Sequence, residues 1–161
     1  CAYSLRGSPW SEAMEVWRAQ NAIREALGMR PNYYNGLPQR YKWATQPHPN
    51  DGADVALRFG FDVLAVPTAP VSLLVEDASL FDIALNGTPV PNIVTGWYLD
   101  RSMHRVTLPP LVAGRNTLEL RCRYTNHMEL EDIYLLGDFG VSLERAIIEE
   151  PERLHFGDWT S

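Results

Sequence analysis

A short run near the middle of the chain has the residue types that a sugar-binding site needs. Within six residues, from Gly96 to Arg101, it holds Trp97, Tyr98, Asp100 and Arg101. Sugars present apolar ring faces surrounded by hydroxyl groups, so an exposed aromatic ring flanked by hydrogen-bonding side chains suits them. These four residues are candidates for carbohydrate binding. The competing interpretation is that Trp97 packs over an edge of the fold and that Asp100 pairs with Arg101 or caps a turn.

A second candidate lies in an aromatic-rich segment closer to the N-terminus. Residues 29–53 are rich in Pro, Asn, Gly and Tyr, and they include Trp43 two residues after Tyr41. Because this number of aromatic residues is unusual in a disordered linker, we expect the segment to lie as a strap over the rest of the fold. Trp43 is the second candidate for stacking on a sugar ring.

The sequence offers little support for catalysis. Glycoside hydrolysis uses two carboxylates about 5–10 Å apart, but twenty acidic residues in 161 make chance pairs common. Glu129 and Glu131 share a face if they lie on a strand, and we interpret them as a solvated face. No Gly-x-Ser-x-Gly run is present. No two histidines have the spacing of a metal site, so no catalytic metal is expected; they are His48, His104, His127 and His155.

Two further features bear on cofactors and redox state. No cofactor is expected. A structural Ca²⁺ site at Asp100 or at the loop 50–52 is an open alternative, because Asp and carbonyl oxygens bind calcium. Cys122 sits in an alternating apolar and polar segment and is interpreted as a small core residue. A disulfide from Cys122 to Cys1 is the less favoured alternative, because terminal residues are usually loose.

Length and charge narrow the class of protein. A chain of 161 residues with 45% apolar residues can bury one core without a disulfide or metal. A formal net charge of −6 without a basic stripe argues against nucleic acid and anionic membranes as partners. The chain starts at Cys1 without a signal peptide, so we expect a processed product or a fragment. Localisation stays unknown, and two lone cysteines slightly favour the cytoplasm for the parent protein.

The chain changes character near residue 53. Ser8 and Pro9 are good helix-start residues, and apolar residues at helical spacing predict one amphipathic helix over residues 9–27. We therefore divide the chain into residues 1–53, a helix and the aromatic strap, and residues 54–161, a domain of short strands. The alternation from Val55 to Val63 predicts a strand with one apolar face.

The strands of the second part are separated by turn residues. Further strands are expected over residues 71–76, 81–85, 97–99, 103–108, 117–124, 132–136, 140–143 and 146–149. Asn86-Gly87 predicts a tight hairpin turn, and residues 113–116 predict another. Many short strands with turns at this spacing are typical of an antiparallel β-sandwich. The strands do not alternate with helices, so a parallel α/β sheet is not expected.

Three segments together resemble a known family. They are the strand ending in Asn86-Gly87, the run 96–100, and the turn 114–116 that opens a strand of alternating aliphatic residues. Over residues 54–148 the chain resembles galactose-binding-like, sugar-binding jelly-roll domains of bacterial glycoside hydrolases, such as family 2 and α-L-rhamnosidase-like enzymes. The resemblance implies a jelly-roll sandwich whose catalytic carboxylates lie on another domain of the same parent chain.

Three functional hypotheses follow. The first is a non-catalytic accessory domain of a larger glycoside hydrolase, with a structural, interdomain role and weak carbohydrate binding. The alternatives are an autonomous carbohydrate-binding module and a small carbohydrate-active enzyme. The segment 157–160 is similar to one that continues into another strand in such proteins, so we expect the last strand to be truncated. The resembling residues are mostly those that shape turns and core, so the sequence leaves sugar binding open.

Overall fold

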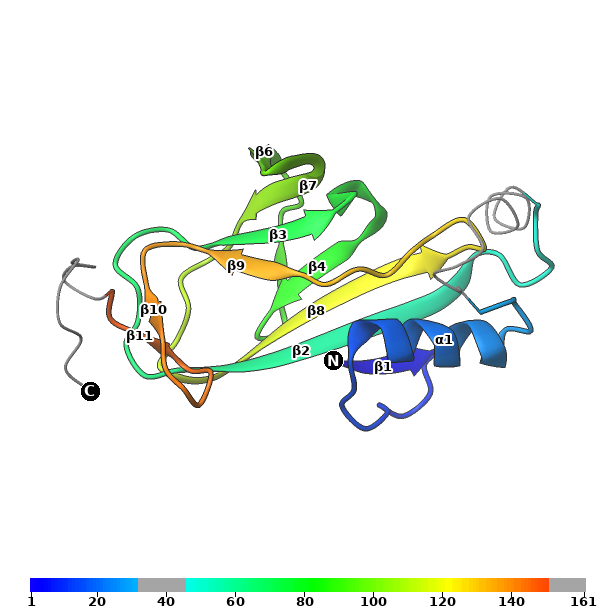
Figure 1. The fold of residues 1–161 in the computed structure, drawn as a ribbon, viewed down its shortest axis with the longest axis horizontal. Coiled ribbons are helices and arrows are strands. Elements are labelled where there is room, and N and C mark those ends of the chain that lie inside the picture. The colour runs from blue at the N-terminus through cyan, green and yellow to red at the C-terminus, as the bar shows by residue number, and fades with distance from the viewer. Residues whose placement is uncertain (32–45, 151–161) are drawn as a thin grey trace, which may run out of the picture.

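Two facing β-sheets and one helix make up the structure, which is a computed structural model (Figure 1). It describes residues 1–31 and 46–150. The mainly β, sandwich-type fold expected from the sequence is confirmed. Trp43 and most of the expected strap lie outside the described residues. So does the segment 157–160, on which the expectation of a truncated last strand rests.

The first sheet is built around a long antiparallel pair, β2 and β8. Its strand order is β10-β11-β2-β8-β4-β5, and β1 also pairs with β2. The pair of β11 with β2 is parallel, and the other pairs of this sheet are antiparallel. The strands are β1 (Ala2–Leu5), β2 (Ala53–Val63), β4 (Asp82–Leu85), β5 (Thr88–Val90), β8 (Gly114–Tyr124), β10 (Gly140–Val141) and β11 (Ile147–Ile148).

The second sheet is smaller and antiparallel. Its order is β6-β7-β3-β9, and a short 3₁₀ helix, η1 (Ala78–Leu80), follows β3. The strands are β3 (Ser72–Glu76), β6 (Val94–Tyr98), β7 (Asp100–Thr107) and β9 (Tyr134–Leu136). Figure 1 shows β6 and β7 at the end of this sheet, away from the long β2–β8 pair.

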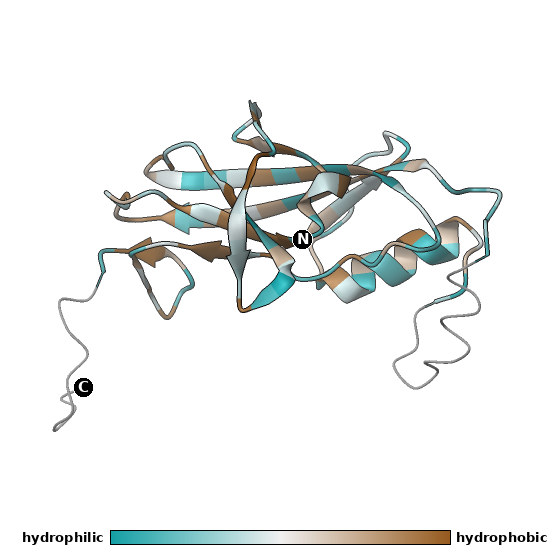
Figure 2. Cartoon of the chain, turned by 90° about the horizontal axis from the view of Figure 1, so that it is seen from above, coloured by the Kyte–Doolittle hydropathy of each residue, from teal (hydrophilic) through white to brown (hydrophobic). Residues whose placement is uncertain are grey.

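The core lies between the two sheets. Leu57 of β2 and Leu120 of β8 face it from the first sheet, and Leu73 of β3 faces it from the second, each at most 2% exposed. The expected apolar face of β2, from Val55 to Val63, is confirmed, because all five alternating residues belong to this core or pack against it. Apolar and polar residues alternate along the long strands (Figure 2).

The N-terminal helix is shorter than predicted. α1 spans Val16–Ala26, whereas the apolar spacing predicted a helix over residues 9–27. The N–H groups that would have started the helix are used elsewhere: Ser11 donates to the Tyr3 carbonyl at 2.9 Å and Ser8 to the Leu5 carbonyl at 3.0 Å. Ser8 therefore closes the turn after β1 instead of capping a helix.

A buried arginine ties α1 to the end of β8. Arg24 is 3% exposed, and its guanidinium donates to the Tyr124 hydroxyl at 3.1 Å and to the Asn126 Oδ1 at 2.7 Å. Its Nε donates to the Arg30 carbonyl at 2.5 Å. A buried charge is costly unless it is hydrogen-bonded, so these oxygens fix where the helix docks.

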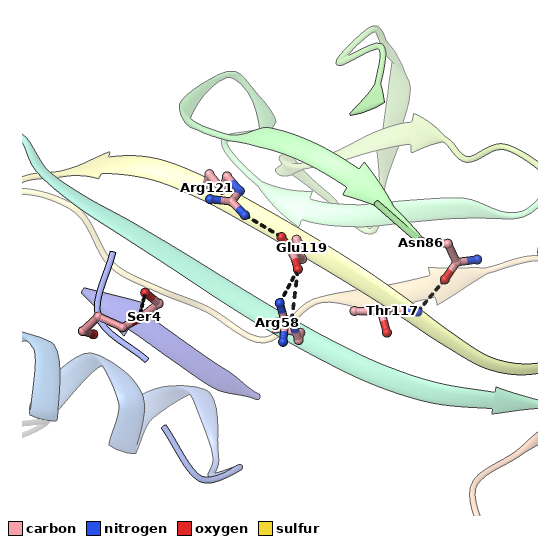
Figure 3. A network of polar contacts seen from close by, with 7 residues as sticks. Ser4, Arg58, Asn86, Thr117, Glu119 and Arg121 are labelled. Atoms are coloured by element: carbon pink, nitrogen blue, oxygen red, sulfur yellow. Dashed lines mark hydrogen bonds and ion pairs between the residues drawn. The ribbon is translucent and has the colours of Figure 1, made fainter. Parts of the chain in front are cut away.

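The two turns that carry the resemblance are joined to each other. Asn86 and Gly87 both have positive φ, 51° and 78°, which confirms the expected tight turn between β4 and β5. The Asn86 side chain donates to Asn116 at 3.0 Å. It also accepts from the Thr117 N–H at 2.8 Å (Figure 3). Asn116 is fully buried and also bonds the backbone of Val112 and Gly114. These residues act as a structural lock between two corners of the sandwich.

Replacing Asn116 with alanine should destabilise the fold strongly. Asn116→Ala removes four hydrogen bonds of a fully buried side chain, among them those to the backbone of Val112 and Gly114. We therefore expect a loss of about 2–4 kcal/mol in the free energy of unfolding. Chemical denaturation followed by circular dichroism measures it. The control is Thr95→Ala, which removes one exposed hydrogen bond and should cost less than about 0.5 kcal/mol. Equal losses for the two variants would contradict the role of the lock.

Candidate functional site

The four clustered candidates lie on one exposed hairpin, β6–β7. Trp97 and Tyr98 end β6, Asp100 and Arg101 begin β7, and Leu99 makes the turn with a φ of 64°. Trp97 is 57% exposed and Tyr98 is 44% exposed. More than half of the Trp97 side chain, on the edge strand of its sheet, is therefore open to solvent.

Asp100 is held within the hairpin. Its Oδ1 accepts hydrogen bonds from the backbone N–H of Ser102 at 2.8 Å and from the Ser102 hydroxyl at 2.9 Å. These bonds lower the pKa of Asp100, the backbone bond having the larger effect. Asp100 thus stabilises the start of β7, while its second carboxylate oxygen makes no hydrogen bond to a described residue.

The hairpin is apolar beyond the predicted residues. Leu99 at its tip is 86% exposed, and Ile93 and Val94 before it are 67% and 45% exposed. Such a group of exposed apolar side chains on a projecting element is typical of an interaction surface. The predicted residues are brought together, but on a projection instead of in a hollow.

A groove lies elsewhere, on the outer face of the first sheet. It encloses about 520 Å³ and crosses β1, β2, β8 and the start of β4. Along β2 the core residues Val55 and Leu57 alternate with Asp54 and Ala56, so Asp54 and Ala56 point to this outer face. The lining comprises Ser4, Arg6, Gly7, Asp54, Val55, Ala56, Ser79, Leu80, Phe81, Asp82, Arg121, Cys122 and Arg123. We call this hollow the sheet-face groove.

Strand register explains why the groove forms there. Ala56 is the direct partner of Ser4 on β1 and of Arg121 on β8, and Arg121 is the direct partner of Asp82 on β4. Directly opposed side chains in a sheet stand about 5 Å apart. Ala56 is the smallest member of this row, so its side chain leaves a hollow between its larger neighbours.

Charged pairs cross the β2–β8 pair on the same face. Asp54 pairs with Arg123 at 2.5 Å, and Asp62 pairs with Arg115 at 2.9 Å. Between them, Glu119 accepts from both Arg58 and Arg121 at 2.8 Å (Figure 3). Each of these pairs is largely exposed, apart from Glu119. We call this series the charge ladder.

Trp10 covers the middle of the ladder. The Arg58 guanidinium carbon lies 3.7 Å from the centre of the Trp10 ring, a cation–π contact that holds the arginine flat on the sheet. Arg58 also donates to Glu119 from both Nε and Nη2. Partial burial acts to raise the pKa of Glu119, but the hydrogen bonds and charges of Arg58 and Arg121 outweigh it, so the pKa is lowered.

The chemistry available in the groove is that of binding. Its walls offer guanidinium donors, carboxylate acceptors and hydroxyl groups beside the exposed Leu80. Cys122 belongs to the lining, but burial raises the pKa of its thiol to about 12, so it is not a thiolate nucleophile at neutral pH. Cys1 and Cys122 are both free, so the alternative of a disulfide between them is wrong.

The loops considered for calcium use their oxygens in hydrogen bonds. Asp51 accepts from the backbone N–H of His48 at 2.8 Å and of Asn126 at 2.6 Å, and Asn50 accepts from Arg6 at 2.7 Å. Within residues 1–31 and 46–150, no group of three or more His, Cys, Asp or Glu side chains is placed to hold a metal ion. Calcium binding at Asp100 or at the loop 50–52 stays a prediction.

The sheet-face groove was missed at the level of sequence. The alternation along residues 55–63 and 117–124 correctly identified which residues face away from the core. It could not tell that Ala56 stands between Ser4 and Arg121, because that depends on pairing between segments more than fifty residues apart. The unexpected strand β1 supplied one wall.

Comparisons with known proteins return nothing. No protein-family model, no curated protein and no solved structure matches this chain significantly. The structure of the described residues contains no helix that is long and apolar enough to cross a membrane. The interpretation of the sheet-face groove and of the hairpin therefore depends on the geometry given above.

The Glu119 network should make stability depend on pH. Because the folded pKa of Glu119 lies below its ordinary value of 4.5, its contribution is present above pH 4.5 and is lost as the pH falls further. In urea denaturation measured across this acidic range, Glu119→Gln should flatten the loss of stability relative to the unmodified chain. The exposed Glu12 serves as the control, and Glu12→Gln should leave the profile unchanged. Identical profiles for all three chains would contradict this role of Glu119.

Proposed function

We propose that this chain is a non-catalytic accessory β-sandwich module that binds carbohydrate on behalf of a larger carbohydrate-active protein. The observation that carries the proposal is the sheet-face groove. Its volume of about 520 Å³ lies within the range of small-molecule sites, about 300–1,000 Å³. The resemblance to sugar-binding jelly-roll domains agrees with it but rests on residues that shape the fold.

The groove offers the pairing that sugars need. Asp82 is exposed and makes no hydrogen bond to another described residue, so its oxygens are free to accept from hydroxyl groups. Leu80, 44% exposed, offers an apolar surface beside it for the face of a ring. Donors and acceptors therefore alternate around a partly apolar wall, which is the complement of a hydroxylated ring.

The non-catalytic part of the proposal rests on the state of the acids. Among the described residues, the two carboxylates whose pKa clearly departs from its ordinary value, Asp100 and Glu119, are both shifted downward. A general acid for glycoside hydrolysis needs a raised pKa. Asp54, on the wall of the groove, is engaged with Arg123, which favours a binding role for this face.

A second candidate function is an interdomain contact through the β6–β7 hairpin. The observation favouring it is the exposed apolar group formed by Ile93, Val94, Trp97, Tyr98 and Leu99. Contacts between domains of one chain use such surfaces. In this reading the hairpin packs on a neighbouring domain of the parent protein, and the groove stays open for sugar.

Substitutions can tell the two surfaces apart in a binding assay. A panel of mono- and oligosaccharides is titrated into the chain while protein NMR shifts or heat are recorded. Ala56→Leu fills the sheet-face groove and should abolish sugar binding, and Asp82→Asn should weaken it about tenfold by removing a charged acceptor. Trp97→Ala, on the hairpin, should leave the affinity unchanged.

The circular dichroism spectrum of each variant is compared with that of the unmodified chain to check that the variant folds. If Ala56→Leu does not fold, Asp82→Asn at the rim carries the test, because its exposed side chain supports no other contact among the described residues. Sugar binding that is lost in Trp97→Ala and retained in both groove variants would move the site to the hairpin. Absence of binding to every sugar in the panel would refute carbohydrate binding altogether.

A further inference from the structure

We propose that the sheet-face groove selects acidic sugars, binding the carboxylate of a uronic acid residue through Arg121. This inference rests on the proposed function, because it names the class of carbohydrate that the same groove takes. It is carried by the charge on the groove walls and by the position of Arg121 within the charge ladder.

The groove is positively charged in an acidic chain. Its walls hold three guanidinium groups and two carboxylates: Arg6, Arg121 and Arg123 against Asp54 and Asp82. The chain as a whole has a formal net charge of −6. A cationic hollow on an otherwise acidic protein attracts an anion locally and disfavours a cation there.

The groove walls carry one positive charge in excess, because Arg6 and Arg121 stand against the single carboxylate of Asp82. Arg123 and Asp54 neutralise each other. Arg121, in contrast, shares the single carboxylate of Glu119 with Arg58, so this trio keeps one uncompensated positive charge. Arg6 is hydrogen-bonded to the neutral side chain of Asn50 and forms no ion pair with a described residue.

Arg121 is placed to meet a carboxylate. It stands directly beside Ala56, the small residue that creates the hollow, and its side chain is 61% exposed. Its bond to Glu119 uses Nη2, so the Nη1 side of the planar guanidinium is free of hydrogen bonds to described residues. Arginine binds carboxylates with this planar fork more specifically than lysine does.

The neighbours of Arg121 favour a hydroxylated anion over a simple one. Asp82 is its direct partner on β4, and a carboxylate at that position repels a bare anion while accepting hydrogen bonds from hydroxyl groups. Ser79 and Leu80 continue this wall. A uronic acid residue suits these three walls: its carboxylate suits Arg121, its hydroxyl groups suit Asp82 and Ser79, and its apolar ring face suits Leu80.

The test uses calorimetric or NMR titration of the intact chain with defined probes. Galacturonate and glucuronate oligomers are compared with the matching neutral galactose and glucose oligomers, and with acetate and inorganic phosphate alone. The acidic oligomers should bind at least about tenfold more tightly than their neutral counterparts. Arg121→Gln should remove that difference and leave the neutral sugars unaffected.

The matched control is Arg115→Gln, which changes an arginine on the same face of the same strand. Arg115 pairs with Asp62 outside the groove, so this variant should keep the preference for acidic sugars. Retention of the preference in Arg121→Gln, or its equal loss in Arg115→Gln, would overturn the assignment. Circular dichroism checks that both variants fold, and Ala56→Leu gives a second way to close the groove.

The remaining outcomes separate this inference from the proposed function. Equal affinity for neutral and acidic oligomers would overturn the acidic-sugar inference and leave carbohydrate binding in the groove intact. Binding of acetate or phosphate as tightly as the uronates, lost in Arg121→Gln, would identify a general anion site and also overturn it. If no oligosaccharide binds, the proposed function itself fails.

Discussion

The antiparallel pairing of β2 with β8 is the constraint on which the rest of this structure depends. Each residue from Ala53 to Val63 has a partner between Gly114 and Tyr124, so one register sets the facing of both strands. On one face it places Leu57 and Leu120 in the core, and on the other it aligns the charge ladder. A slip by one residue would exchange the two faces, burying arginines and exposing leucines. β1 and β11 attach to β2, and β4 attaches to β8, so the register also determines where the groove walls stand.

The corner lock explains why the sequence could resemble a sugar-binding family without indicating a site. Asn86 and Asn116 each belong to a turn motif, and their side chains bond each other. Asn86 also bonds the backbone of the opposite corner at Thr117, and Asn116 bonds the backbone of its own corner at Val112 and Gly114. A side chain with every polar atom engaged inside the fold is not available to a ligand. The residues behind the resemblance therefore shape the architecture, and the binding proposed for the sheet-face groove depends on residues such as Arg121 and Asp82 that lie outside those motifs.

The local features of this fold could be predicted and the non-local ones could not. Alternation identified β2, β8 and their core faces, and Asn86-Gly87 predicted its hairpin, because both signals are complete within a few residues. The helix was predicted to start too early because the N–H groups of Ser8 and Ser11 bond to β1, a strand too short to recognise. The groove needs four strands in register, and so no single segment predicted it. The hairpin residues Trp97, Tyr98, Asp100 and Arg101 were correctly grouped because they are neighbours in sequence, and their placement on a projection depended on tertiary structure.

The charge ladder shows how a binding feature can arise from residues that also stabilise a sheet. Two of its pairs, Asp54 with Arg123 and Asp62 with Arg115, match one cation to one anion. Exposed pairs of this kind contribute at most about 1 kcal/mol each, so stability alone places little demand on their arrangement. The pattern changes beside Ala56, where Arg58 and Arg121 share Glu119 and one charge stays unmatched. The unmatched charge and the missing side-chain volume lie at neighbouring positions of the same row. In the proposed site, the unmatched charge would attract the carboxylate of a uronic acid and the missing volume would admit its ring.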